Sequence, residues 1–177
     1  LPGMHVVYTV PVYVKPTGWG GEVWPVLNVK VRERSGGDCR EGIDLLRQVL
    51  AQRAPDGDVE RLLGTEADRV IRASGGLFRE LFRLVSGLLL KNGPLPVRPE
   101  DIDQVERQQR SQAIAGLTQE QWTILRQVKE TQQLIVPREL TSEAWTLQAL
   151  GYVLCYRNGT VDWFGVHPLL ENLLDED

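Results

Sequence analysis

Three residues in one short segment have the types and spacing needed to bind an anion. Gly75 and Gly76 separate two segments of helical periodicity, and Arg79 follows on the first turn of the second. Glycines lack a side chain, so a ligand or another backbone can come close to them. A helix that begins there offers free N–H groups and its positive dipole end, and arginine offers a planar fork of donors. The segment therefore predicts a contact with a phosphate oxygen.

Arg79 also has a second interpretation. It precedes Glu80, and an arginine on a helix surface can simply pair with a neighbouring carboxylate. The sequence leaves both interpretations open, whereas Arg83, one turn further on, is expected to be structural. The phosphate-cradling loop G-x-x-x-x-G-K-[ST] does not occur in the chain. These residues are therefore expected to cover a nucleotide rather than to hold it.

Other reactive side chains form no recognisable site in the sequence. Cys39 and Cys155 lie far apart without a C-x-x-C or Cys/His cluster, so we expect two free thiols rather than a disulfide or a metal site. His5 and His167 are also isolated, and we expect surface or packed histidines. No metal ligand set and no Ser/His/Asp or Cys/His combination can be assembled with confidence from the sequence.

One block of sequence precedes the segment with Gly75 and Gly76, and a second block contains it. Residues 1–37 are rich in valine and aromatic residues and predict two strands, over 4–14 and 23–34. Residues 38–117 carry apolar residues at helical spacing, with Gly64-Thr65 as a break. This second block predicts helices over 41–53, 59–73, 77–90 and 99–112.

The third block, residues 118–177, has a different order of elements. A capping box at Thr118–Gln121 opens a helix, Leu134–Val136 predicts a short strand, and Thr141-Ser142 is a natural N-cap for a helix ending at Leu150. Asn158-Gly159 between two alternating segments is typical of a hairpin. Helix, strand, helix and hairpin is the order of a winged helix. The expected fold is therefore mostly α with a small β part: two core strands, a helical bundle and a C-terminal winged helix.

Charge is distributed unevenly along the chain. The whole chain has a net charge of −4; residues 118–177 contain nine acids and four bases, giving −5, so the first 117 residues carry +1. No apolar run approaches the roughly 20 residues of a membrane span, and no signal peptide is apparent. We therefore expect a cytoplasmic protein without a membrane partner. Because the chain starts at Leu1 in strand-like sequence, we expect a fragment of a longer protein.

Four segments together resemble the C-terminal half of prokaryotic AAA+ or STAND-type P-loop ATPases. They are Val6–Pro11, Ser74–Arg79, Val153–Gly159 and Trp163–Leu169, the last of which includes a His-Pro step. The resemblance spans nearly the whole chain, divided as 1–37 (end of the ATPase core), 38–117 (helical lid) and 118–177 (winged helix). It implies the following site residues: Arg79 with Gly75 and Gly76 as a sensor-2-like nucleotide contact, Thr9 as a sensor-1-like residue, Arg32 and Arg34 as arginine fingers, and Asn158 and Gly159 in the wing.

The resemblance implies a coupling function that depends on the rest of such a protein. A lid and winged helix link ATP binding and hydrolysis to domain movement, and the partners are the remainder of the ATPase core and a protein or neighbouring subunit. ATP and Mg²⁺ are expected only in the full-length protein. The P-loop and the acidic magnesium-binding strand of the family are absent from this chain, so the chain alone is expected to bind neither and to catalyse nothing.

A stand-alone binding module is the alternative function. A winged helix can bind DNA, but its expected second helix contains Glu143 and no lysine or arginine, in a block of net negative charge. Phosphate contacts need positive charge, so nucleic acid is disfavoured and a protein partner preferred. Roles without a function also remain open: Arg32 and Arg34 can be solvated charges at a strand end, and Thr9 can be an ordinary strand residue.

Overall fold

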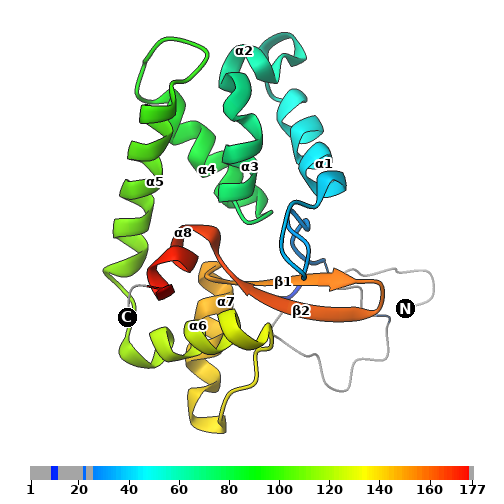
Figure 1. Ribbon diagram of the computed structural model, residues 1–177, viewed down its shortest axis with the longest axis vertical. Coiled ribbons are helices and arrows are strands. Elements are labelled where there is room, and N and C mark those ends of the chain that lie inside the picture. Colours follow the sequence, from blue (N-terminus) through cyan, green and yellow to red (C-terminus); the bar gives the residue numbers. More distant parts are fainter. Residues whose placement is uncertain (1–8, 12–21, 23–25, 176–177) are drawn as a thin grey trace, which may run out of the picture.

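The computed structural model describes residues 9–11, 22 and 26–175, and it is mostly helical with one two-stranded antiparallel sheet (Figure 1). The expected fold class, mostly α with a small β part, is confirmed. No helix within the described residues has the length and apolar character to cross a membrane. The α-helices are α1 (Arg40–Ala51), α2 (Val59–Leu63), α3 (Ala67–Ala73), α4 (Phe78–Leu89), α5 (Pro99–Ile114), α6 (Gln119–Thr131), α7 (Thr141–Leu150) and α8 (Pro168–Glu171).

Residues 38–117, the helical block, fold around the apolar stripes of α1 to α5. The stripes meet in one cluster whose fully buried members include Ile43, Leu63, Ile71, Leu81 and Ile102. The helices begin and end within two residues of the periodicity-based predictions. The predicted break at Gly64 is confirmed as a 3₁₀ turn, Gly64–Glu66, which separates α2 from α3.

Residues 118–175, the C-terminal block, place two helices against a hairpin. Both hydrogen bonds of the predicted capping box are formed at the start of α6, and Gly151 ends α7 with φ +77°. The hairpin consists of β1 (Val153–Asn158) and β2 (Val161–Val166). Asn158 pairs with Val161, so the two-residue turn is Gly159-Thr160 rather than the predicted Asn158-Gly159. Across the strands, Tyr156 and Trp163 stack with ring centroids 4.6 Å apart.

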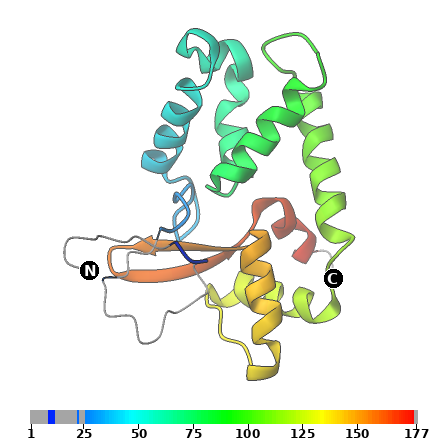
Figure 2. The same ribbon diagram turned by 180° about the vertical axis from the view of Figure 1, so that it is seen from behind.

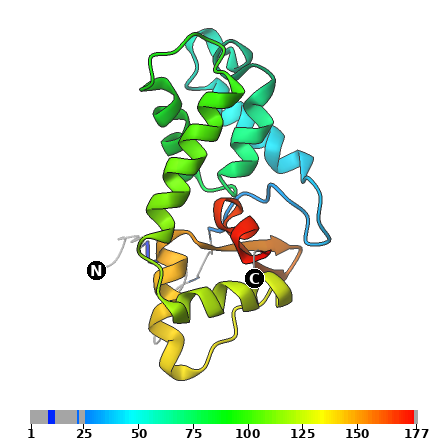
Figure 3. The same ribbon diagram turned by 60° about the vertical axis from the view of Figure 1, so that its left-hand side comes forward.

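Helices α5 and α8 join the two blocks (Figures 2 and 3). Helix α5 runs from the helical block to the C-terminal block, with Ile102 in the first hydrophobic cluster and Ala113 in the second. Helix α8 lies between the blocks, and Arg110 Nε of α5 donates a hydrogen bond of 2.9 Å to the Leu169 carbonyl of α8. The two hydrophobic clusters are therefore bridged by a helix and by polar contacts.

Four local predictions are wrong where the structure describes the residues. Residues 26–37, the N-terminal segment, form no strand but only an isolated bridge between Arg32 and Asp38. Of the other predicted strand, only residues 9–11 are described, and they are not in a strand. Residues 134–136 also lack strand structure. Helix α7 follows directly from a 3₁₀ turn, so no extended residue precedes it and no side chain caps it.

Candidate functional site

The glycine turn, residues 74–77, connects α3 to α4 with two successive positive φ angles. Gly75 has φ +61° and Gly76 has φ +80°, values that residues with a side chain rarely adopt. Ser74 fastens the turn, because its hydroxyl donates to the Ile71 carbonyl at 2.6 Å and accepts from the Gly76 N–H at 3.2 Å. The sequence order Ser-Gly-Gly thus specifies a tight reversal immediately before α4.

Protein atoms fill the space that the two glycines leave. A Cβ atom on Gly76 would lie 1.8 Å from the Val29 carbonyl oxygen, and the Val29 N–H donates to the Gly76 carbonyl at 3.2 Å. A Cβ on Gly75 would lie 2.4 Å from Leu154 Cδ1. The buried Tyr156 hydroxyl donates to the Gly75 carbonyl at 2.7 Å. At Gly76 another backbone therefore comes close, whereas at Gly75 the close neighbour is a side chain.

Arg79 lies on the first turn of α4 and reaches the C-terminal block. Its Nη2 donates to the carbonyl oxygen of Leu150, the last residue of α7, at 3.2 Å. Its Nε donates to Glu80 at 3.2 Å, so the ion pair of the second interpretation is present. The Arg79 side chain is nevertheless 63% exposed. The Glu80 carboxylate is only 8% exposed and also pairs with Arg83 at 2.7 Å.

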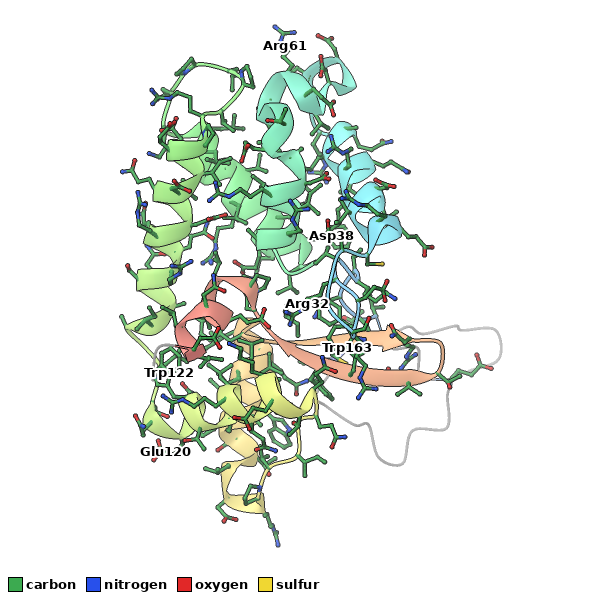
Figure 4. The ribbon with its side chains drawn as sticks, in the orientation of Figure 1. Arg32, Asp38, Arg61, Glu120, Trp122 and Trp163 are labelled. Atoms are coloured by element: carbon green, nitrogen blue, oxygen red, sulfur yellow. The ribbon has the colours of Figure 1, made fainter. Side chains whose placement is uncertain are left out.

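Arg32 is the most enclosed of the predicted arginines (Figure 4). It lies above Trp163, with its guanidinium carbon 6.0 Å from the ring centroid. It forms an ion pair with Glu171 and donates to the Val166 carbonyl at 3.2 Å. A Cβ on Gly165 would lie 2.3 Å from Arg32 Nη2, so this glycine makes room for the guanidinium. Arg32 therefore bridges the N-terminal segment, β2 and α8.

Arg34 and Thr9 have simpler surroundings. Arg34 Nε donates to the Gln132 side chain at 3.0 Å, and the Gln132 amide donates back to the Arg34 carbonyl at 2.8 Å. An arginine finger would require Arg32 and Arg34 to leave these partners. Thr9 is exposed and lies outside any strand, while the neighbouring residues 1–8 fall outside the described part of the chain.

The hairpin tip is more open than the glycine turn. Asn158 accepts a hydrogen bond of 3.0 Å from Lys30 Nζ, which ties the end of β1 to the N-terminal segment. Gly159 has φ +59°, and a Cβ on it would meet nothing within 4 Å. Gly159 is therefore needed for its backbone conformation and not for a close contact.

His167 is a junction residue whose surroundings the sequence did not predict. It is 4% exposed, and its Nδ1 accepts the Leu169 N–H at 3.3 Å, which caps α8. Its Nε2 is buried without a hydrogen-bond partner among the described residues. Burial lowers the pKa of His167 to about 4, and the nearby charges of Arg83 and Arg32 act in the same direction. The His-Pro step was its only signal in the sequence.

The two cysteines form no disulfide in the described part of the chain. Cys39 and Cys155 are free thiols, as predicted. Both are buried, and burial raises the pKa of the Cys155 thiol to about 11, which makes it a poor nucleophile. No cluster of His, Cys, Asp and Glu within the described part of the chain could hold a metal ion. The structure instead brings Gly75, Gly76, Arg79 and Arg32 to one junction between the blocks. Comparisons of the chain with protein-family models, curated proteins and solved structures found no match.

Proposed function

We propose that this chain is the lid and winged-helix part of a prokaryotic AAA+ or STAND-type ATPase, and that it couples nucleotide state to domain movement. One observation carries the proposal. The glycine turn touches the N-terminal segment through Val29 and the C-terminal block through Tyr156, while Arg79 follows it on α4. A ligand bound by Arg79 would therefore act on α4 directly after the glycine turn, which contacts both the N-terminal segment and the C-terminal block.

Arg79 is the residue that fits a phosphate. Its guanidinium is largely exposed and lies on the first turn of a 12-residue helix, where the helix dipole also favours an anion. The N–H groups of Gly75 and Gly76 donate to Arg72 and Ser74 and are not free for a ligand. The proposal therefore gives the nucleotide contact to Arg79 and gives the two glycines the task of placing it.

The coupling follows from differential binding. A ligand shifts a conformational equilibrium only by its difference in affinity for the two states. Arg79 would bond the terminal phosphate of a triphosphate and would have no such partner in a diphosphate. ATP and Mg²⁺ would be held by the remainder of the ATPase core, which also supplies the chemistry of hydrolysis.

The test is hydrolysis by a protein that carries this chain together with a P-loop. Arg79→Ala should slow turnover by roughly one to three orders of magnitude while diphosphate affinity stays within about twofold. Unchanged turnover would remove Arg79 from the mechanism. The coding sequence upstream of Leu1 gives a first check, because the proposal requires a P-loop and an acidic strand end there.

A stand-alone module that docks a protein is the second candidate, and one observation favours it. Trp145 and Leu150 on α7 and Ile135 before it are about half exposed or more, although all three are large and apolar. Such side chains suit a protein interface better than a nucleic acid, since α7 has no basic residue. Absence of a P-loop upstream, together with co-purification of a partner that is lost on Trp145→Ser, would favour this module.

A further inference from the structure

The carbonyl end of α7 lacks a cation of its own. Its last turn contains no basic residue, although a helix C-terminus carries partial negative charge and unpaired carbonyl groups. Arg79 supplies the missing cation from α4, 71 residues away in the sequence, through its bond to the Leu150 carbonyl. The end of α7 packs closely against Leu77 and Arg79, because a Cβ on Gly151 would lie 3.4 Å from Arg79 Nη2 and 2.7 Å from Leu77 Cδ1.

Glu80 holds the other side of the same guanidinium. It is buried, lies 3.2 Å from Arg79 Nε and is shared with Arg83. Two arginines on adjacent turns of α4 contact one buried carboxylate, and these contacts hold the Glu80 side chain in place beside Arg79. Arg79 is thus oriented by a fixed carboxylate while its outer nitrogen meets a neutral peptide carbonyl.

We propose that the Leu150 carbonyl is the resting partner of Arg79, and that the C-terminal block releases α4 when a terminal phosphate takes its place. This inference rests on the proposed function. A phosphate carries full negative charge and can accept two guanidinium N–H groups at once, whereas the Leu150 carbonyl is neutral, so arginine prefers the phosphate. The high exposure of Arg79 lets it change partners without first opening the junction.

A substitution at Gln148 can shift the competition between the Leu150 carbonyl and a phosphate while Arg79 itself stays unchanged. It lies in the last turn of α7, is half-buried, and shares a small crevice with Leu77 and Gly151. A lysine at this position would satisfy the carbonyl end of α7 and repel Arg79, whereas a glutamate would attract it. The two substitutions differ mainly in charge, so each is the matched control of the other.

The decisive experiment is steady-state ATP hydrolysis by the P-loop-containing protein with the two substitutions. Gln148→Lys should raise turnover at subsaturating ATP about twofold to fivefold, and Gln148→Glu should lower it by a similar factor, as expected for charges near a surface. Neither should have an effect in an Arg79→Ala background. Equal effects of the two substitutions, or effects that persist without Arg79, would overturn the proposal.

Amide hydrogen exchange on the present chain tests the resting contact separately. Arg79→Ala should speed exchange at Gly151 and Tyr152, at the end of α7, about threefold to tenfold, while Arg83→Ala should leave it unchanged. If exchange responds but Arg79→Ala does not alter hydrolysis, the proposed function fails and the phosphate competition fails with it. If hydrolysis responds but exchange and the Gln148 pair do not, only the resting-partner proposal is refuted.

Discussion

Gly76→Ala should be among the most destabilising single-methyl additions to this chain. The methyl group would lie 1.8 Å from the Val29 carbonyl oxygen, a backbone atom that moves only if the N-terminal segment moves. A positive φ costs a residue with a side chain about 1–2 kcal/mol. Overpacking and loss of the Val29–Gly76 hydrogen bond add about 2 kcal/mol. We therefore expect the free energy of unfolding to fall by about 3–4 kcal/mol in urea denaturation.

Gly37→Ala is the matched control for that prediction. Gly37 has φ +85°, close to the +80° of Gly76, but a Cβ on it would meet nothing within 4 Å. Both substitutions reduce the entropy of the unfolded chain equally, so this contribution cancels in the comparison. Gly37→Ala should cost only about 1 kcal/mol, the conformational part. Equal losses for the two variants would refute the claim that Val29 packs against the glycine turn.

Two further predictions concern protonation and nucleic acid. Because the folded-state pKa of His167 is about 4 and its unfolded value about 6.5, the unfolded chain takes up the proton first as pH falls, and about 2 kcal/mol of stability should be lost between pH 8 and pH 5. Urea titrations of His167→Asn, which keeps an acceptor for the Leu169 N–H, should show a smaller loss. The chain should show no affinity tighter than roughly 10⁻⁴ M for a short DNA duplex at physiological salt by anisotropy, since the net charge is −4; micromolar binding that weakens steeply with salt would contradict this.

Helices were predicted well because their signals are local. Apolar spacing located α1 and α4, and the capping box at Thr118 located the start of α6, since each of these patterns lies within one or two turns. The hairpin was also predicted, but its turn is displaced by one residue. Asn158 pairs with Val161 as the last residue of β1, and its side chain accepts from Lys30, a contact that the local sequence does not contain.

Strands and the junction were predicted less well because they depend on distant partners. Residues 26–31 have a strand-like composition, yet a strand needs a neighbour along its whole length. Here Asn28 donates to Cys155 and Val29 to Gly76, so the segment divides its hydrogen bonds between two different elements and forms no ladder. Burial of His167 has the same cause, because one of its close neighbours is distant in the sequence: a Cβ on Gly75, in the helical block, would lie 3.5 Å from His167 Cδ2.

Cationic side chains make many of the polar contacts between the first 117 residues and the C-terminal block. The first 117 residues carry +1 and the last 60 carry −5, and five cationic side chains of the first part donate hydrogen bonds to the C-terminal block: Lys30, Arg32, Arg34, Arg79 and Arg110. Arg32 is 24% exposed and contacts a carboxylate, a carbonyl and an aromatic ring, so its ion pair is screened less by solvent than a pair between fully exposed side chains. Among the described residues of the C-terminal block, Glu171, the partner of Arg32, is the one charged acceptor for these five side chains, and the other four donate there to neutral amide or carbonyl oxygens. Arg34 and Arg79 are both exposed and both donate to a neutral acceptor in the C-terminal block, and of these two Arg79 is the one on the first turn of a helix, where the helix dipole also favours an anion.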